Sequence, residues 1–290
     1  MSVRIIQERL DAYQCQTAQA EENALREITQ EVILAALSRT DFFKKSAFQG
    51  GTALRILYSL QRFSEDLDFV LKEPRTAFQL KPYLDLMSLE LQAYGYEFEI
   101  VDREQASSAV KKAFLKDDSL VKVVRLKYLK SDRSQRHLKI KIEVDANPPA
   151  GSHFKLHYLT FPFSYAVTAQ DMPSLFAGKS HALLCREYLK GRDWYDFIWY
   201  VSRKTPVNFD VLSSALNQQG PWRNQRLNVN LQWYVAQIKK KIEATNWPQA
   251  RDDVMPFVKP GEQSSLDVWS ADFFMDCLQK WQANLNQSIE

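Results

Sequence analysis

Apolar residues recur at helical spacing along the first 45 residues of the chain. Ile33, Ala36 and Leu37 illustrate the three- and four-residue steps, which bring such side chains onto one face of an α-helix. Residues 1 to 45 are therefore predicted to form a helical segment that packs on the core.

Residues 46 to 168 combine two periods. Short stretches that alternate between polar and apolar residues, or are fully apolar, lie between stretches of helical spacing. The extended stretches are residues 47–49, 66–71, 96–101, 120–129, 137–145 and 159–167, and helical spacing covers residues 52–60, 77–94 and a basic stretch near 109–116. This mixture predicts an α/β region with several strands.

From residue 169 onward the pattern is helical. The predicted helices cover residues 173–189, 194–202, 209–216, 231–244 and 266–285. The clearest break in the chain is Asn147 to Gly151, which contains two prolines and is a candidate boundary. We predict an α+β fold with three parts: a helical segment (1–45), a mixed sheet with flanking helices (46–168) and a helical C-terminal domain (169–290).

The composition fits an intracellular protein. Lys and Arg number 38 against 35 Asp and Glu, and the net charge of +3 is too small to indicate a nucleic-acid partner by itself. The three cysteines lie far apart without zinc or disulfide spacing, which favours a reducing compartment. There is no apolar run of membrane-spanning length and no apolar signal-peptide centre. We expect a cytoplasmic protein without membrane contact.

Two aspartates carry the clearest chemical signal. Asp66 and Asp68 are two residues apart on a predicted strand, so their side chains project from the same face. Such a pair can hold one or two divalent cations, and Mg²⁺ prefers carboxylate oxygens together with phosphate oxygens. Asp66 and Asp68 are therefore predicted to bind Mg²⁺ or Mn²⁺.

A glycine turn precedes this pair. Gly50 and Gly51 remove side chains that would keep backbone N–H groups away from a phosphate, and the helix predicted to begin at Thr52 directs its positive end to the same place. Alone, a double glycine is usually a plain turn, and two spaced aspartates often mark an exposed strand end. Together, in this order, they predict a phosphate cradle beside metal ligands at neighbouring strand ends.

Two blocks of sequence resemble one known family. GGTALR at residues 50–55, followed by RFSEDLDF at 62–69, resembles the AbiEii/AbiGii toxin family of the DNA polymerase beta-like nucleotidyltransferase superfamily. KSHALLCR at 179–186, followed by GRDWYD at 191–196, resembles that family's K-x-x-A-L-x-x-R and G-R-D-x-Y-D motifs. The resemblance spans about residues 47 to 200. It implies a nucleotidyltransferase-fold sheet and a helical C-terminal domain that completes the active-site cleft.

The resemblance also implies roles for residues of the first block. Asp66 and Asp68 would hold the catalytic metal. The residues expected to bind the nucleotide or its phosphates in this block are Gly50, Gly51, Thr52, Arg55, Arg62 and Ser64. Their chemistry is that of backbone donors, hydroxyls and guanidinium groups facing an anionic ligand.

Residues of the second block would complete the site. Lys179 would reach the triphosphate as a mobile positive charge. Asp193 and Asp196, at i and i+3, would share one helix face directed toward the cleft, with Asp193 in nucleotide binding and Asp196 in catalysis. Without the resemblance, Asp193 fits equally well as an acidic residue that stabilises a helix start.

A third metal ligand is expected from a later strand. Glu143 and Asp145 lie on one face of the predicted strand at 137–145, together with Lys139 and Lys141. We assign Glu143 as the third carboxylate and keep Asp145 as the alternative. An alternating Lys and Glu face is also common where a strand face is only solvated.

The predicted reaction is nucleotidyl transfer. An acceptor hydroxyl attacks the α-phosphorus of an NTP, and pyrophosphate leaves toward Gly50, Gly51 and Lys179. The resemblance implies a toxin of a bacterial toxin–antitoxin or phage-defence (abortive infection) system that modifies the tRNA 3′ end and has a cognate antitoxin. With tRNA as acceptor, the basic stretch at 111–130 would contact the RNA backbone, and salt would weaken binding. A small-molecule (antibiotic-type) nucleotidyltransferase and an inert nucleotide- or RNA-binding relative remain open as alternatives.

Overall fold

The computed structural model describes residues 2–97, 99–102, 110–117 and 138–287. The chain divides into two compact units. The sheet unit comprises Met1–Ser59, Phe63–Pro148 and Phe154–Ala169, and the helical unit comprises Leu60–Arg62, Pro149–His153 and Gln170–Glu290. The short segment Leu60–Arg62, just before the predicted aspartate pair, thus belongs to the helical unit.

The sheet unit contains a mixed sheet whose described strands number seven, in the order β3-β4-β5-β2-β1-β7-β6. β1 pairs with β2 antiparallel and with β7 parallel, β2 pairs with β5 parallel, and β4 pairs antiparallel with β5 and β3. The strands are β1 (Ser46–Gln49), β2 (Leu67–Leu71), β3 (Glu99–Asp102), β4 (Val110–Asp117), β5 (Leu138–Asp145), β6 (Phe154–Leu159) and β7 (Tyr165–Gln170). The prediction of a mixed sheet with flanking helices is confirmed.

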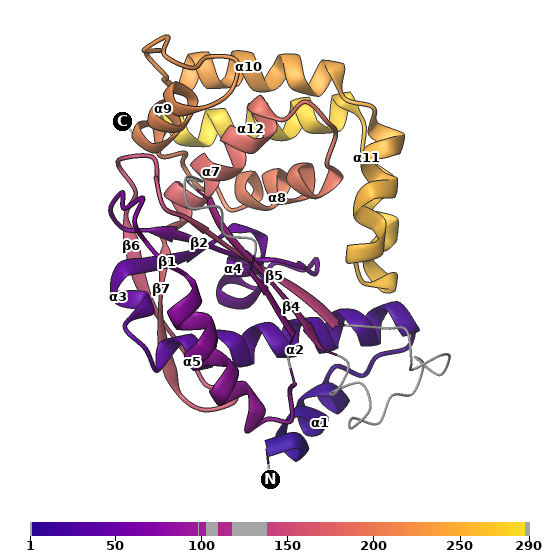
Figure 1. The fold of residues 1–290 in the computed structure, drawn as a ribbon. Coiled ribbons are helices and arrows are strands. Elements are labelled where there is room, and N and C mark those ends of the chain that lie inside the picture. Colours follow the sequence, from indigo (N-terminus) through magenta and orange to yellow (C-terminus); the bar gives the residue numbers. More distant parts are fainter. Residues whose placement is uncertain (1, 98, 103–109, 118–137, 288–290) are drawn as a thin grey trace. The chain divides into compact units, whose positions relative to one another are not determined.

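Helices cover this sheet, and one of them supports the predicted site. The helices are α1 (Ser2–Ala12), α2 (Ala18–Ser38), α3 (Phe42–Lys45), α4 (Gly50–Tyr58) and α5 (Lys81–Gln92). α2 packs against α5 and β5 (Figure 1). Its apolar face is fully buried at Ile28 and Val32. From the same helix the Gln30 amide donates hydrogen bonds to the carbonyls of Ser64 and Glu65 at 3.1 and 2.9 Å. α2 therefore fixes the loop that leads into the aspartate pair.

Several predicted elements differ from the structure. The basic stretch near 109–116, predicted as helix, is strand β4, because its backbone pairs with β5 along the whole strand, and tertiary pairing overrides a weak local preference. The stretch at 159–167, predicted as one extended piece, contains the end of β6, a connecting turn and the start of β7. The helix predicted from Thr52 begins at Gly50, so Thr52 lies inside its first turn. The predicted strand at 120–129 lies outside the described residues.

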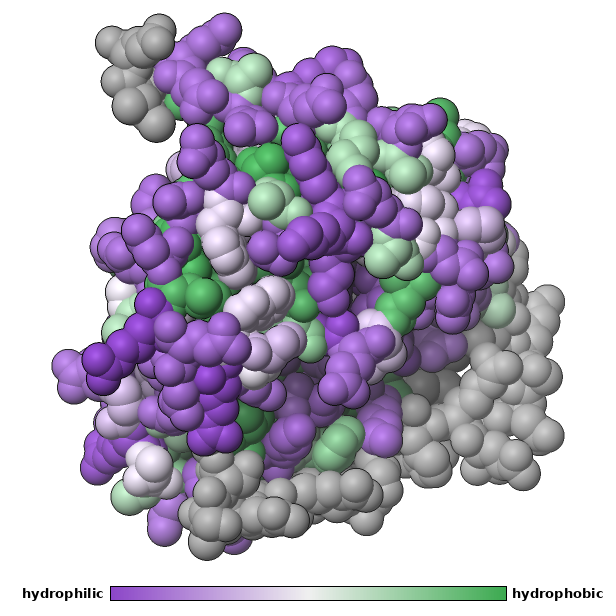
Figure 2. Space-filling model, turned by 90° about the horizontal axis from the view of Figure 1, so that it is seen from above, coloured by the Kyte–Doolittle hydropathy of each residue, from purple (hydrophilic) through white to green (hydrophobic). Residues whose placement is uncertain are grey.

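The helical unit is built around aromatic side chains. Phe176 stacks on Tyr200 with ring centroids 4.4 Å apart, and the buried Trp281 donates an indole hydrogen bond to the Thr205 carbonyl at 2.8 Å. On the face shown in Figure 2, hydrophilic side chains predominate and the hydrophobic ones form separate small patches. The helices are α7 (Met172–Cys185), α8 (Gly191–Ser202), α9 (Phe209–Gln218), α10 (Leu231–Ala244), α11 (Trp247–Val254) and α12 (Ala271–Gln287), with 3₁₀ turns at Met255–Phe257 and Pro260–Leu266. The predicted helical C-terminal region is confirmed, although α11 was not expected.

Candidate active site

Gly50 brings the start of α4 against the carboxylate of Asp68. Its φ is +79°, a left-handed conformation that side-chain-bearing residues rarely adopt. A Cβ atom added at Gly50 would lie 2.4 Å from the Asp68 Oδ2 and 3.0 Å from the Asp68 Cβ. Both the backbone conformation and the close approach therefore require glycine here. The sequence had suggested this glycine for phosphate access, and the structure adds that it makes room for Asp68.

The two aspartates lie at the start of β2. Asp66 immediately precedes the strand, and Asp68 is its second residue. That their side chains share one face stays a prediction. The hydroxyl of the fully buried Thr52 donates a hydrogen bond to the Asp66 carbonyl. Thr52 thus ties the first turn of α4 to the strand start, and any nucleotide contact from it has to come from its backbone.

Glu143 is the register neighbour of Asp68. The parallel pairing of β2 with β5 places Asp68 opposite Glu143 and Val70 opposite Asp145, so Glu143 is the nearer of the two acidic candidates along the strand. Its carboxylate is 2.9 Å from the Lys112 Nζ and 2.7 Å from the Lys141 Nζ. Within the described ranges, no three His, Cys, Asp or Glu side chains are grouped so that they could hold a metal ion. Glu143 is therefore close to the aspartate pair in register while its oxygens bind two lysines.

The lysines beside Glu143 set its charge. Burial would raise the pKa of Glu143, but hydrogen bonds from Lys141 and Lys112 outweigh burial and hold its pKa below the usual value. Burial likewise opposes the charge of Lys141, yet Glu143, Asp66 and Asp68 together raise the pKa of Lys141. Lys141 is thus a permanent cation within electrostatic reach of both aspartates.

A separate cluster of charges lies in the helical unit. The Lys179 Nζ is 2.7 Å from Asp193 Oδ1 and 2.7 Å from Asp196 Oδ2, which confirms that the two aspartates share one face of α8. The guanidinium of Arg62 binds Asp196 through two hydrogen bonds of 2.6 Å, and Arg186 binds Asp193. Three cations and two carboxylates leave one net positive charge in this network, which we call the α7–α8 ion cluster.

Burial and charge act against each other in this cluster. The Asp196 side chain is fully buried, and burial alone would raise its pKa, but Arg62 and Lys179 lower it below the ordinary value. Burial would lower the pKa of Lys179 and of Arg62, and the two aspartates raise both. Asp196, Lys179 and Arg62 therefore stay charged because their neighbours are charged.

A sequence profile decides the family. The profile described as "Nucleotidyl transferase AbiEii toxin, Type IV TA system" matches residues 32–277, most of the chain. The chain belongs to the AbiEii nucleotidyl transferase toxin family. It is a nucleotidyltransferase, and its family is one in which the toxin is paired with an antitoxin. A search of curated proteins gave no significant match.

Solved structures share the AbiEii fold at low sequence identity. A crystal structure from Helicobacter pylori, described as that of a "putative nucleotidyltransferase", is 14% identical with a TM-score of 0.50, covering 91% of this chain and 94% of that one. The nucleotidyltransferase toxin MenT4 from Mycobacterium tuberculosis H37Rv is 15% identical with a TM-score of 0.52, covering 95% and 99%. These likenesses establish the nucleotidyltransferase-like fold. None of the helices in the described part of the chain combines the length and the apolar character that a membrane span requires.

The two arginines of the AbiEii motif segment have acidic partners. The Arg55 Nε is 2.7 Å from a Glu27 oxygen, and its guanidinium lies 4.5 Å from the Phe63 ring centroid within the sheet unit. Arg62 is held by Asp196 within the helical unit, and its side chain is 3% exposed. Ser64 is half-buried, with its carbonyl bound by Gln30. The nucleotide contacts assigned to Arg55, Arg62 and Ser64 stay predictions.

Sequence reasoning missed the partners that position these groups. Lys141 and Glu143 were visible as neighbours on one strand face, but the contact of Lys112 with Glu143 depends on the β4–β5 register. The glycine of the G-R-D motif has a packing role that no local signal reveals, since a Cβ at Gly191 would lie 1.8 Å from the Ala250 carbonyl oxygen of α11. In both cases the deciding neighbour is distant in sequence.

Proposed function

We propose that this toxin transfers a nucleoside monophosphate from an NTP to the 3′ end of tRNA in the cytoplasm, with a divalent cation held by Asp66 and Asp68. The observation that carries the proposal is the close approach of Gly50 to Asp68, which joins a helix start to an acidic pair. A helix N-terminus favours phosphate, and carboxylates favour the cation that accompanies it.

Carboxylate donors are the chemical type that suits Mg²⁺ or Mn²⁺. Asp66 and Asp68 offer such oxygens at the start of β2, and Glu143 is the register neighbour of Asp68 on β5. The cation, once bound together with the triphosphate, would neutralise the charge that develops on the phosphate oxygens. Glu143 binds Lys141 and Lys112, so in our proposal its part is secondary to that of the two aspartates.

The protein's own residues then position the phosphates and balance the charge of the acidic site. The N–H groups at the start of α4 bind phosphate oxygens, and Thr52 keeps that turn attached to the strand that carries Asp66. Lys141 offsets the charge of the acidic site when no nucleotide is present. In this proposal, Lys179 and Asp193 contribute to nucleotide binding and Asp196 holds Lys179 in place.

The acceptor is tested by labelled transfer. Purified protein is incubated with Mg²⁺, each α-labelled NTP in turn and total tRNA, and a parallel sample contains tRNA whose 3′ diol has been destroyed by periodate. We expect label on intact tRNA alone. Transfer to oxidised tRNA, or to no RNA at all while the protein still binds NTP, would contradict the tRNA 3′ end as acceptor.

The role of Lys179 needs a readout besides activity, because its ammonium already binds two carboxylates. Lys179→Ala and Lys179→Arg are compared for the KM of the NTP and for thermal stability. Nucleotide contact predicts a raised KM in both variants, even where Lys179→Arg keeps wild-type stability. If nucleotide binding weakens only in the variant that is also less stable, Lys179 contributes to folding and not to nucleotide binding.

A further inference from the structure

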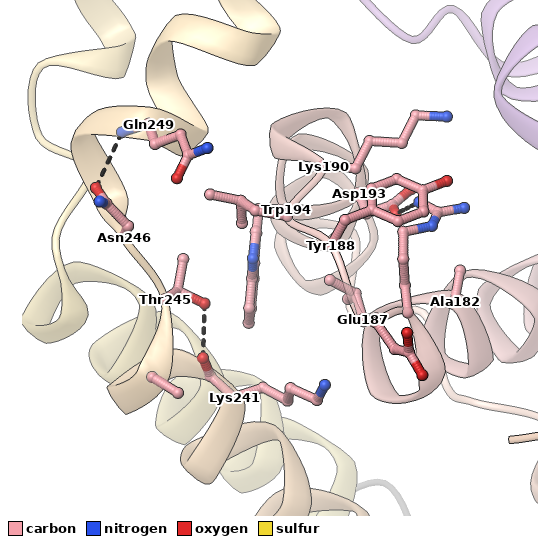
Figure 3. A pocket seen from close by; sticks show the side chains of 14 residues that line it. Ala182, Glu187, Tyr188, Lys190, Asp193, Trp194, Lys241, Thr245, Asn246 and Gln249 are labelled. Carbon is pink, nitrogen blue, oxygen red and sulfur yellow. Dashed lines mark hydrogen bonds and ion pairs between the residues drawn. The ribbon is translucent and has the colours of Figure 1, made fainter. Parts of the chain in front are cut away.

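The helical unit contains a pocket of about 340 Å³ between α7, α8, α10 and α11. Tyr188 and Lys190 line it from the loop after α7, Trp194 from α8, Lys241 from α10 and Gln249 from α11. In Figure 3, Trp194 lies between the Gln249 side of the pocket and the side of Tyr188 and Lys190. The volume is in the range of pockets that bind small organic ligands.

The charges around this pocket favour an anion. Arg186, Lys190 and Lys241 line it, and neither lysine has an ion-pair partner among the residues that the structure describes. Of the two acidic lining residues, Asp193 is bound by Lys179 and Arg186, and Glu187 is exposed, where water and salt screen its charge. The net effect is an excess of positive charge on the pocket wall.

The positive charges around the pocket repel the ammonium group of Lys190. Burial lowers the pKa of Lys190, and the positive charges of Arg192, Lys179 and Arg186 lower it further against the attraction of Asp193. A bound phosphate would offset this repulsion and favour the charged form of the ammonium. The pocket is therefore preorganised for a negative group.

Aromatic residues supply the second part of the recognition. Tyr188 is 66% exposed, although it lines the pocket, and the Arg186 guanidinium lies 5.1 Å from its ring centroid. Trp194 is 3% exposed and makes edge contacts with Trp247 and Phe274, at centroid distances of 5.1 and 5.2 Å, so it forms a packed part of the pocket wall. Exposed aromatic rings beside cations are the usual means of binding single-stranded nucleotides, since bases stack on them.

We propose that this pocket binds one nucleoside 5′-phosphate, with the base against Tyr188 and the phosphate at Lys190 and Lys241. The Gln249 amide, which points from α11 toward Trp194 in Figure 3, offers both a donor and an acceptor to the base edge. The pocket belongs entirely to the helical unit, so this binding does not depend on transfer chemistry at Asp66 and Asp68. The phosphate comes either from a free nucleotide or from a nucleotide within an RNA strand.

The test uses the full chain carrying Asp66→Ala and Asp68→Ala, so that a failure of binding is distinct from a failure of transfer. Binding of each free nucleoside monophosphate and of a short labelled single-stranded RNA is measured over a range of salt. Tyr188→Ala and Lys241→Ala are then added singly. The matched controls are Tyr158→Ala, at a ring that is 76% exposed in the sheet unit, and Lys240→Ala, an exposed lysine of the same helix that does not line the pocket.

Tyr188→Ala is expected to weaken binding about tenfold, as removal of one stacked base contact does. Lys241→Ala is expected to lower the slope of log affinity against log salt by about 0.7, the value for one phosphate of a single strand. If the two substitutions weaken the binding of both the free nucleotide and the RNA, the pocket is a site for free nucleotides. If they weaken only the binding of RNA, the pocket holds a nucleotide of an RNA strand. Equal effects of test and control variants, or no binding by protein that is folded by circular dichroism, would overturn the proposal.

Discussion

Single contacts determine where the charged groups of this toxin lie. Gly50 leaves room for the Asp68 carboxylate, and Arg62 and Lys179 keep Asp196 charged inside the helical unit. The sequence motifs identified these residues, but not their partners. The motif aspartates of the two blocks also differ in setting: Asp68 lies beside a helix start, whereas Asp196 is fully buried between two cations.

Gly50→Ala tests the contact with Asp68. The added Cβ clashes with the carboxylate at 2.4 Å and requires a left-handed backbone, so we expect a stability loss of about 1–2 kcal/mol and a large fall in transfer rate. Gly178→Ala is the matched control, because a Cβ there meets nothing within 4 Å and alanine favours a helix. For each variant, urea unfolding measures the stability and initial rates measure the transfer. Wild-type activity in Gly50→Ala would show that Asp68 does not need its present position.

Asp196→Asn tests the buried α7–α8 ion cluster. Removing one charge leaves Arg62 and Lys179 without their shared partner, and we expect the protein to lose about 3–5 kcal/mol of stability. Because the pKa of Asp196 is lowered in the folded state, its stabilising contribution is present above the ordinary carboxylate pKa and is lost as the pH falls through the folded value. Urea denaturation at several pH values measures this. The control is Asp276→Asn, at an exposed ion pair with Lys280, and it should change the stability little. Equal losses of stability in the two variants would contradict this role of Asp196.

Among the elements, α2 connects the N-terminal helix to the site. It carries Gln30, which binds the carbonyls before Asp66, and Glu31, which binds the Arg9 guanidinium of α1 at 2.8 Å. Glu27 of the same helix holds Arg55 of α4. Changes in α2 are therefore expected to affect both the attachment of α1 and the loop that precedes the aspartates.

Glu31→Gln tests this helix through pH. Burial raises the pKa of Glu31 to about 7, although Arg9 opposes the shift. An acid whose folded pKa is raised binds a proton more readily when folded, so its contribution to stability falls as the pH rises from about 4.5 to about 7. We expect the wild type to lose stability relative to Glu31→Gln over this range, as measured by urea unfolding. If the difference in stability between the wild type and Glu31→Gln is the same at every pH, Glu31 has an ordinary pKa.

Periodicity predicted most of the helices and the mixed sheet, because apolar spacing along α2 and α10 reports directly on burial. It failed at β4, where the sequence Val110 to Asp117 has no clear alternation and only pairing with β5 makes it a strand. It also missed α11, whose short apolar face gives little signal. The site motifs could be recognised in the sequence. The partners of Lys112, Arg62 and Glu27 could not, because these contacts join residues that are distant in sequence.

At the scale of the whole molecule, the AbiEii toxin divides its motif residues between two compact units. The glycine turn and Asp66 with Asp68 belong to the sheet unit, and Lys179 with Asp193 and Asp196 belongs to the helical unit, which also takes Leu60–Arg62. The family accounts for nucleotidyl transfer. The acceptor, the cation and the nucleotide pocket of the helical unit are proposals that separate experiments address.

The most direct test of the central claim is the divalent-cation dependence of transfer. α-Labelled NTP and tRNA are incubated with wild-type protein, Asp66→Ala, Asp68→Ala and the control Glu73→Ala, an exposed carboxylate just after β2. Each protein is assayed in chelator and then with increasing Mg²⁺ or Mn²⁺. We predict that only the wild type and Glu73→Ala regain activity with the cation, and that each aspartate variant is slower by about a thousandfold or more. Undiminished transfer in chelator, or by either aspartate variant, would contradict a metal site at Asp66 and Asp68.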